Sequence, residues 1–442
     1  MRQTLFFIPD HLGPLSLFGP FGWLSILWIV FAGGLIAWMV RREGWNAETR
    51  SYLPVAGIVW LAIAFVVPFL MEDGRGIPIR GYGVLLLCGV IAGVALGAYR
   101  ARQMGVDPEV IFSLAFVMFV TAIVGARAFY VIQYWKEFAE VATADGTRPA
   151  TWGETMRDVL NVTKGGLVVY GSLIGGLIGG GWFLARRGIP MLATADMIAP
   201  SLLVGLALGR LGCLMNGCCF GGVCETDWIG PVWVGRITFP GEQATHPPVE
   251  SPPYQQQREA GLLQGITIGE NEAGLPEVAA VDPQGPAAKS GLKPGDDILS
   301  INGRPVLSGE SARIALLSAR TGIKLERARG GPVAWKLPAR SLPVFPAQIY
   351  AAINAAILAL LLWVAYPFRL RDGFIMALLL TLYPITRILE EAIRSDEPGR
   401  WGTGLTISQL VSVGILLAVV PLWIYIFRQP AKLAYPAQAA VG

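Results

Sequence analysis

Long apolar stretches recur along the chain and constrain its fold more than any other feature. A transmembrane helix needs about 20 consecutive, mainly apolar residues, because its backbone polar groups must be satisfied within the helix once water is excluded. Nine stretches have roughly this length: residues 17–40, 53–71, 81–99, 110–134, 166–185, 194–215, 346–366, 373–393 and 406–427. The sequence therefore predicts an all-α, polytopic membrane protein with about nine transmembrane helices.

Composition supports this fold class. Hydrophobic residues make up 53% of the chain, charged residues make up 15%, and the mean hydropathy is +0.52, which lies outside the range of ordinary soluble domains. The net charge of +4 is small, so we expect no binding to nucleic acid. Residues 1–20 contain neither a basic start followed by a short apolar core nor a clear cleavage site, so we expect no removed signal peptide.

Lysines and arginines in the short loops predict the orientation, because basic residues are retained on the cytoplasmic side of a membrane. They gather in alternate loops: Arg41/Arg42/Arg50, Arg100/Arg102, Arg186/Arg187, Arg369/Arg371 and Arg428/Lys432. With nine helices, this pattern places the N-terminus outside and the C-terminus inside. The outward loops would then be 72–80, 135–165, 216–345 and 394–405.

The longest outward loop contains a predicted soluble insert. A polar, Pro-rich linker, "ESPPYQQQREAG", is followed by short β-like runs with Gly and Pro between them, as far as "LPARSLPVFP". Within the insert, "VAAVDPQGPAAKSGLKPGDDILSINGRPV" (278–306) resembles a PDZ domain of the kind carried by bacterial envelope proteases. Such domains bind extended peptides, often C-termini, by strand addition, and residues 261–269 are the best candidate for the carboxylate-binding loop. A PDZ fold that serves only as a spacer or lid is the alternative.

Ionisable side chains and tyrosines within or beside the predicted spans mark a candidate site, because charged groups are costly in a membrane and are usually functional. Two sets of three residues have helical spacing, so each set occupies one helical face. The first is Arg127, Tyr130 and Tyr134 (i, i+3, i+7), and the second is Arg387, Glu391 and Arg394 (i, i+4, i+7). Three further polar residues lie near span ends beside glycines: Tyr82, Tyr170 and Arg210. The spacing of Arg387 and Glu391 is that of an i, i+4 ion pair.

Arg210 and Arg387 have few acidic residues near them in the predicted membrane region. The main candidates are Glu390, Glu391 and Asp196. Because a guanidinium binds phosphate bidentately, we expect an anionic ligand, and a phospholipid head group is the natural candidate at the outer membrane surface. The alternative is that each arginine extends to the surface or neutralises a carboxylate of a neighbouring helix.

Four cysteines lie at an outward membrane edge, in the pattern Cys213-x4-Cys218-Cys219-x4-Cys224. These spacings differ from the C-x2-C pairs of structural zinc modules, and the nearby imidazole is His246 alone, so we expect no metal and no cofactor. A disulfide between some pair and simple apolar packing are both more consistent with the pattern. A nucleophilic cysteine would lack a histidine close in sequence to activate it.

The same polar residues belong to motifs that resemble the bacterial phosphatidylglycerol:prolipoprotein diacylglyceryl transferase family. "GRLGCLMNGCCFGG" (209–222) looks like the family's signature segment, and six other pieces stand in family order around it: "IRGYG", "GARAFYV", "KGGLVVYGSLIGG", "FPAQIYA", "RILEEAIRSDEP" and "ISQLVS". They cover the seven-span core of the family, with two extra helices before it. The expected domains are 1–77 (extra helices), 78–250 (core, first part), 251–342 (PDZ-like insert with linkers) and 343–442 (core, second part).

The resemblance implies an enzyme of the bacterial cytoplasmic (inner) membrane, with the insert on its periplasmic face. The expected substrates are phosphatidylglycerol and secreted lipoprotein precursors, whose lipobox cysteine thiol would receive the diacylglyceryl group with release of glycerol phosphate. Carried over residue by residue, the resemblance assigns catalysis to Arg210, Arg387, Tyr170 and Tyr82. It assigns substrate binding and support of the site to Arg127, Asn216, Gly221, Gln348, Tyr350, Glu391 and Arg394.

The chain also departs from the family motifs at several positions. Tyr170 stands where some members have histidine, Cys213 and Cys218 replace a signature Asn and Glu, and Phe345 replaces a histidine. Three functions are therefore compared: an active transferase whose insert recruits precursors, a non-catalytic scaffold that binds phospholipid and gathers envelope peptides, and a thiol redox enzyme. We favour the transferase, because the arginines singled out on physical grounds coincide with motif positions.

Overall fold

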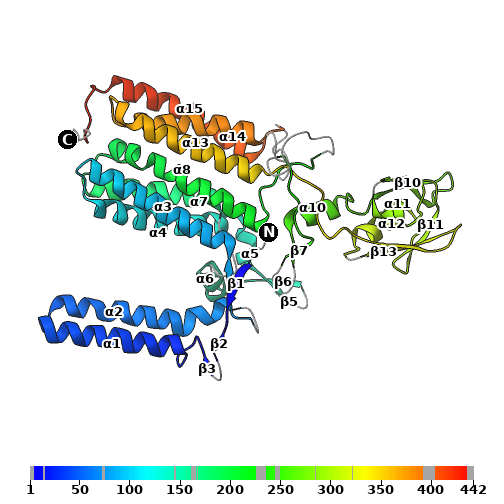
Figure 1. Cartoon of the computed structure of the whole chain (residues 1–442), viewed down its shortest axis with the longest axis horizontal. Coiled ribbons are helices and arrows are strands. Elements are labelled where there is room, and N and C mark those ends of the chain that lie inside the picture. Colours follow the sequence, from blue (N-terminus) through cyan, green and yellow to red (C-terminus); the bar gives the residue numbers. More distant parts are fainter. Residues whose placement is uncertain are drawn as a thin grey trace. The chain divides into compact units, whose positions relative to one another are not determined.

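The structure is a computed structural model of the 442-residue chain. It describes residues 4–12, 15–71, 75–143, 146–160, 166, 168–224, 235–243, 249–283, 285–320, 322–391 and 404–435. The described chain divides into two compact units: the first is drawn from residues up to 85 and from 211 to 349, and the second from residues 86–210 and 350–435. Figure 1 labels their helices and strands. Three helices, α3, α8 and α13, contribute residues to both units.

The first unit begins with a hairpin of apolar helices, α1 (Trp23–Glu43) and α2 (Ala47–Leu61). Helix α1 ends at Gly44, whose φ of 79° is unfavourable for other residues. Asn46 caps α2 by accepting a hydrogen bond from the Thr49 N–H (2.8 Å). The chain then continues in short π and 3-10 turns (Ala62–Leu70), and strand β4 (Ile77–Arg80) pairs antiparallel with β1 (Thr4–Ile8). A small hairpin, β2 (His11–Leu12) with β3 (Leu15–Ser16), precedes α1.

The insert is a small, mainly β module of the first unit. Helix α10 (Pro252–Glu259) precedes two sheets: the hairpin β9 (Ile266–Glu270) and β10 (Pro276–Val281), and a four-stranded sheet of order β12-β11-β13-β14. The four strands are β11 (Ile298–Ile301), β12 (Arg304–Pro305), β13 (Gly322–Arg327) and β14 (Val333–Lys336). Helix α11 (Pro286–Lys289) lies between β10 and β11 in sequence, and α12 (Gly309–Leu317) lies between β12 and β13. Val278, Ile301 and Leu325 are fully buried in one apolar core. A separate β module between the predicted linkers is therefore present, and its assignment as a PDZ domain stays a prediction.

The second unit is a helical bundle. Its helices are α3 (Gly81–Gln103), α4 (Pro108–Gln133), α7 (Val169–Arg186), α8 (Met191–Asn216), α13 (Ala347–Ala365), α14 (Phe374–Glu391) and α15 (Ile407–Arg428). Between α4 and α7 lie short elements: α5 (Trp135–Ala139), β5 (Glu140–Thr143), β6 (Gly146–Pro149) and α6 (Trp152–Leu160). The two short strands pair antiparallel.

Glycines allow α4 and α7 to pack with their backbones close together. A Cβ atom built on Gly175 would lie 2.2 Å from the carbonyl oxygen of Thr121, and one built on Gly171 would lie 2.4 Å from that of Gly125. Neither distance is tolerable for real atoms, so these positions require glycine at this separation. Small residues at helix contacts are typical of membrane bundles, where close packing takes the place of the hydrophobic effect.

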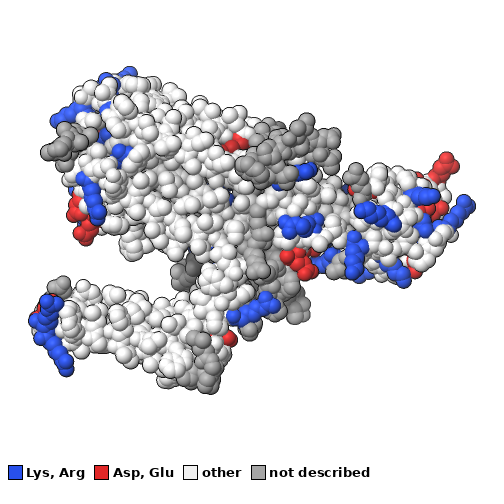
Figure 2. All heavy atoms as spheres, in the orientation of Figure 1, with Lys and Arg blue, Asp and Glu red and all other residues white. Residues whose placement is uncertain are grey.

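Seven helices of the described residues are long and apolar enough to cross a membrane: Trp23–Glu43, Tyr52–Phe69, Gly81–Gln103, Pro108–Gln133, Met191–Asn216, Ala347–Phe368 and Ile407–Arg428. The class of integral membrane protein is thus confirmed. The two other predicted spans are helices α7 and α14, each of 18 residues, but α7 is rich in glycine and α14 carries three charged residues. Figure 2 agrees with this description, since Lys and Arg gather at helix ends and on the insert, while the helix flanks carry few charges.

One end of the bundle is closed by polar contacts. The carboxylate of Asp196, on α8, accepts hydrogen bonds from the backbone N–H groups of Gly373 (2.7 Å) and Met376 (2.8 Å), and so caps the first turn of α14. The buried Arg369 side chain lies 3.9 Å from this carboxylate and donates to the carbonyl oxygens of Tyr366 and Tyr435. Asp196 therefore has a structural role in helix capping.

Candidate functional site

The signature segment forms the end of α8 and the turn after it, in the first unit. Helix α8 ends at Asn216, and Gly217 follows with a φ of 78°. Tyr82, at the start of α3, packs directly on Gly212, where a Cβ would lie 3.0 Å from Cδ2 of the tyrosine ring. This contact explains the glycine at 212, and it leaves the Tyr82 side chain 39% exposed. Asn216 is half-buried at the helix end.

Gln348 connects this turn to the beginning of α13. Its side chain is 1% exposed, its Nε2 donates to the carbonyl oxygen of Cys218 (2.7 Å), and its Oε1 is buried without a hydrogen-bond partner among the described residues. Gly221 is buried and donates its N–H to the carbonyl oxygen of Phe345 (2.8 Å). Both residues therefore connect the turn after α8 to the chain just before and at the start of α13, and their functional roles stay predictions.

Three cysteines of the segment lie together. The Sγ atoms of Cys213, Cys218 and Cys219 are all within 4.8 Å of one another, and the three side chains are half-buried. None of the five cysteines, all of which lie in the described residues, forms a disulfide. The linear spacing hid this cluster, because the turn at Gly217 brings the residues after the helix back toward its last turn.

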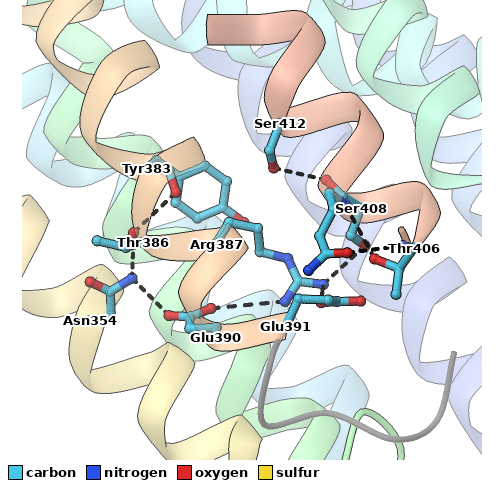
Figure 3. A network of polar contacts seen from close by, with 10 residues as sticks. Asn354, Tyr383, Thr386, Arg387, Glu390, Glu391, Thr406, Ser408 and Ser412 are labelled. Carbon is cyan, nitrogen blue, oxygen red and sulfur yellow. Dashed lines mark hydrogen bonds and ion pairs between the residues drawn. The ribbon is translucent and has the colours of Figure 1, made fainter. Parts of the chain in front are cut away.

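In the second unit, Arg387 lies in a polar network between α13, α14 and α15 (Figure 3). The arginine is 7% exposed, and its Nη2 forms an ion pair with Oε2 of Glu391 (2.7 Å) and donates to Oγ of Ser408 (3.0 Å). The pair expected from the i, i+4 spacing is present. Glu391 is 3% exposed, so both charges have left bulk water and stabilise each other.

A second carboxylate is held back from the same arginine. Oε2 of Glu390 lies 3.9 Å from Nη1 of Arg387, too far for a hydrogen bond. Nδ2 of Asn354, on α13, donates to Oε1 of Glu390 (2.7 Å) and to Oγ1 of Thr386 (2.9 Å), as Figure 3 shows. Nη1 and Nε of Arg387 consequently have no hydrogen bond to the described residues, and these donors are available for an anion.

Sequence reasoning missed Asn354 and did not assign a role to Ser408 or Glu390. Asn354 is the one amide side chain in the apolar run 349–365, which was a usable signal, because a polar side chain in a span is usually paired with another helix. Ser408 lies in a motif that was quoted for its resemblance alone.

Arg127 contacts the backbone at the end of α6 and in the segment that follows it. Its guanidinium donates to three backbone carbonyl oxygens, those of Asp158 (2.5 Å), Val159 (2.9 Å) and Gly166 (3.1 Å). Gly166 has a φ of 79°, and a Cβ there would lie 2.7 Å from Nη1 of Arg127. The arginine thus fixes the chain between α6 and α7, and its role in substrate binding stays a prediction.

The remaining predicted residues are placed as follows. Tyr170 is the second residue of α7, and Tyr350 is the fourth residue of α13. Arg210 lies on α8, before the helix ends at Asn216. Each is half-buried and has polar or ring partners. Arg394 and His246 lie outside the described residues.

An apolar cavity of about 420 Å³ lies within the second unit, between α3, α4, α7 and α8. Glycines line much of it: Gly89, Gly93 and Gly97 on α3, Gly176 on α7 and Gly205 on α8. The absence of side chains at these positions creates the space, and its walls are almost entirely apolar. Its chemistry suits a hydrocarbon chain.

Comparison with known proteins adds to this geometry. The family model described as "Prolipoprotein diacylglyceryl transferase" matches residues 68–425. The phosphatidylglycerol–prolipoprotein diacylglyceryl transferase of Rhodopirellula baltica is 34% identical, over 95% of this chain and 88% of its own length. Proteins of the same name from Gloeobacter violaceus and Bacillus cereus are 34% and 33% identical, over 36% and 31% of this chain and 55% and 46% of their own lengths.

The match to the Rhodopirellula baltica protein is long enough to include residues before the family region, so this relative is similar beyond the shared core. The names of the relatives favour an enzyme over a non-catalytic scaffold. With a family model over most of its length and a relative of this identity and coverage, the chain belongs to the prolipoprotein diacylglyceryl transferase family of membrane enzymes.

Proposed function

We propose that this enzyme transfers the diacylglyceryl group of phosphatidylglycerol to the lipobox cysteine thiol of secreted lipoprotein precursors and releases glycerol phosphate. The single observation that carries the proposal, beside family membership, is the environment of Arg387. A 7%-exposed arginine keeps two nitrogen positions free of hydrogen bonds to the described residues, at the C-terminal end of a helix in a membrane bundle. A phosphate diester supplies the acceptor oxygens that those donors require.

The chemistry requires that charge be stabilised on a phosphate. The substrate sulfur, after losing its proton, forms a bond to the terminal glycerol carbon of the diacylglyceryl group, and the bond between that carbon and the phosphate oxygen breaks. The bonding electrons leave with the oxygen, so negative charge grows on the departing glycerol phosphate. Donors already in place at that oxygen lower the barrier, because they need no reorganisation during the reaction.

Arg210 is the proposed second phosphate ligand, and Tyr82 and Tyr170 are proposed to line the site. Glu391 and Ser408 would orient Arg387, since both contact its Nη2. Asn216, Gly221, Gln348 and Tyr350 would support the signature turn and the start of α13. Arg127 and Arg394 are proposed to contact the substrates.

The glycine-lined cavity supports a lipid substrate. We assign it to an acyl chain of phosphatidylglycerol, because burial of each CH₂ group in an apolar cavity contributes about 0.8 kcal/mol. The β module is proposed to be a PDZ domain that binds an extended peptide of the precursor. We place it on the periplasmic face of the bacterial inner membrane, with the N-terminus outside and the C-terminus inside.

Mass spectrometry of a lipobox peptide, incubated with the protein in phosphatidylglycerol vesicles, tests the proposal. We expect the mass of one diacylglyceryl group to be added to the peptide cysteine. Arg387→Ala and Arg210→Ala should each lower the rate by at least about a hundredfold, the effect of removing one donor to a developing oxyanion. Arg102→Ala, at an exposed position on α3, is the matched control and should retain the wild-type rate.

Two results would contradict the proposal. One is an unmodified peptide with folded wild-type protein, and the other is full activity in both arginine variants. A vesicle without phosphatidylglycerol is the control for the lipid, and it should give no product.

A further inference from the structure

The three clustered thiols are the strongest feature that the proposed function leaves unused. Their sulfur atoms lie within 4.8 Å of one another, a separation that one thiophilic ion can bridge with only small side-chain adjustments. The cluster is half-buried, so its sulfur atoms are shielded from bulk water yet remain open to an entering ion. None of the three thiols is bonded to another cysteine.

The cluster lies where a helix favours a cation. It sits at the C-terminal end of α8, a helix of 26 residues, and the partial negative charge of a helix C-terminus stabilises positive charge within the last turn. The carbonyl oxygen of Cys213 already accepts the N–H groups of Gly217 (2.9 Å) and Cys218 (3.2 Å). Three bare thiolates are disfavoured at this position, and a divalent ion that they share offsets two of their three negative charges.

Backbone conformation supports a role for the thiol of Cys219. This residue has a φ of 59°, the left-handed region that favours glycine, in a segment where Gly217, Gly221 and Gly222 are all close in sequence. A non-glycine residue held in this region costs on the order of 1 kcal/mol. A cysteine at this position therefore retains a side chain at an energetic cost, which a binding role explains.

The surrounding protein holds the cluster in place. The amide of Gln348 fixes the carbonyl oxygen of Cys218, and its own Oε1 is buried without a partner among the described residues. A buried amide oxygen without a hydrogen bond is costly, and a donor group bound beside this turn would satisfy it. This second observation is independent of the sulfur positions.

We propose that Cys213, Cys218 and Cys219 form a three-thiolate site for Zn²⁺ with its fourth coordination position open. Three thiolates with Zn²⁺ leave a net charge of −1, whereas Cu⁺ would leave −2, so the divalent ion suits a half-buried site better. Zinc sites with three protein ligands keep the fourth position for water or substrate.

The open position fits a second thiol, that of the incoming lipobox cysteine. This part rests on the proposed function. A thiol that coordinates zinc loses its proton to solvent, and the bound thiolate is then the nucleophile that attacks the glycerol carbon. The thioether product is a weak ligand and leaves the metal. Tyr170 stands where some members of the family have histidine. Zinc would then deprotonate the substrate thiol, a step for which this chain has no histidine at that position.

The test uses the reduced, metal-free full-length protein in detergent, titrated with Zn²⁺ and separately with Co²⁺. We expect one ion per chain and thiolate-to-cobalt charge-transfer absorption in the near ultraviolet. A lipobox peptide should then increase this absorption, and the same peptide with serine in place of its cysteine should not. This readout does not depend on turnover, so it separates failure of the metal site from failure of the proposed transferase activity.

Cys213→Ser and Cys219→Ser should each weaken zinc binding by at least about a hundredfold, since even outer-shell changes cost 10- to 100-fold. Cys88→Ser, an exposed cysteine on α3, is the matched control and should bind as the wild type does. Absence of zinc binding by the reduced wild-type protein overturns the site, as does equal binding in a folded triple serine variant. An absorption spectrum that the cysteine peptide leaves unchanged overturns the open position.

Discussion

At the scale of single residues, the distance between Glu390 and Arg387 is the most informative quantity of the candidate site. Arg387 already has a full ion pair with Glu391, and a second carboxylate in contact would occupy its remaining donors. Asn354 holds Glu390 at 3.9 Å through a hydrogen bond to the opposite carboxylate oxygen. We interpret Asn354 as a positioning residue that keeps Arg387 available for phosphate.

Substitution of Asn354 tests this role, because it should change the affinity for phosphatidylglycerol in one direction only. In Asn354→Ala, Glu390 loses the hydrogen bond that directs its carboxylate away from Nη1 of Arg387, so the KM for phosphatidylglycerol should rise by about tenfold, the cost of roughly one hydrogen bond to a charged group. The double variant Asn354→Ala/Glu390→Gln should recover much of the lost affinity, because the competing charge is gone. Lipidation kinetics at varied phosphatidylglycerol content measure both. An equal loss in the single and double variants would contradict this role.

Residue positions in the site were only partly predictable. The pair Arg387–Glu391 follows from helical spacing alone and is confirmed. The contacts of Asn354 with Glu390 join α13 to α14, and the rotation of one helix against another is absent from a single sequence. The sequence indicated the four cysteines at one membrane edge, but not that three of their sulfur atoms lie together, because linear spacing does not report a helix end followed by a left-handed glycine.

At the scale of elements, the contact between α4 and α7 depends on the missing side chains of α7. Gly175→Ala should destabilise the protein by about 1–3 kcal/mol, the usual cost of overpacking, because its Cβ would meet the Thr121 carbonyl and the Gly125 backbone. Thermal unfolding in detergent measures the change. Gly181→Ala is the matched control on the same helix, since nothing lies within 4 Å of its Cβ position, and it should unfold at or above the wild-type temperature.

In the insert, Asp296 connects the turn before β11 to strand β13. Burial acts to raise the pKa of this carboxyl, but hydrogen bonds from the Lys293 N–H (3.0 Å) and the Arg327 guanidinium (2.9 Å) lower the pKa below its ordinary value. A lowered folded-state pKa means that the ionised group stabilises the fold above its unfolded pKa. This contribution is lost as the pH falls through the folded-state pKa.

Asp296→Asn should therefore destabilise the insert at neutral pH, by about 1 kcal/mol for a partly exposed pair, and the difference from the wild type should shrink below about pH 4. Hydrogen–deuterium exchange of insert peptides within the full chain, corrected for intrinsic pH dependence, measures this. Glu310→Gln, at an exposed position on α12, is the control and should exchange like the wild type. A pH-independent difference would argue against the charge of Asp296 as the cause.

Element boundaries agree with the sequence to within a few residues for several spans. The predicted span 194–215 corresponds to helix Met191–Asn216, and the predicted span 110–134 corresponds to helix Pro108–Gln133. Helix α3 extends beyond the predicted 81–99 to Gln103, because Arg100 buries its guanidinium against the rings of Trp363 and Tyr366. Hydropathy predicts that a helix ends before such an arginine, because hydropathy carries no information on contacts with another helix.

At the scale of the whole molecule, the insert has an apolar core of its own, drawn from residues 266–337. Replacement of residues 261–337 by a short Gly/Ser linker keeps α10, whose Gln257 bonds to Leu342 in both directions. We expect this variant to modify a short lipobox peptide as the wild type does, but to modify a full-length precursor more slowly, if the module recruits precursors. Competition between the two substrates in one vesicle preparation measures the preference. Equal loss on both substrates would indicate that the module supports the fold instead.

The architecture was predictable to the level of an integral membrane protein with a mainly β segment in its longest loop, because hydropathy and linker composition distinguish long apolar helices from such a segment. Orientation and the PDZ assignment stay predictions. Hydropathy is less informative for α14. This helix forms within the predicted span, but its three charged residues reduce its apolar character.

The polar partners of α14 also bear on how the protein is made. A charged residue near the centre of a nascent helix costs about 2.5–3.5 kcal/mol at the translocon, and α14 carries three near one end. Its charges and its first turn are compensated by Asn354 on α13, Ser408 on α15 and Asp196 on α8. We therefore expect α14 to leave the translocon only together with its neighbours, so that its insertion waits until α15 has emerged from the ribosome.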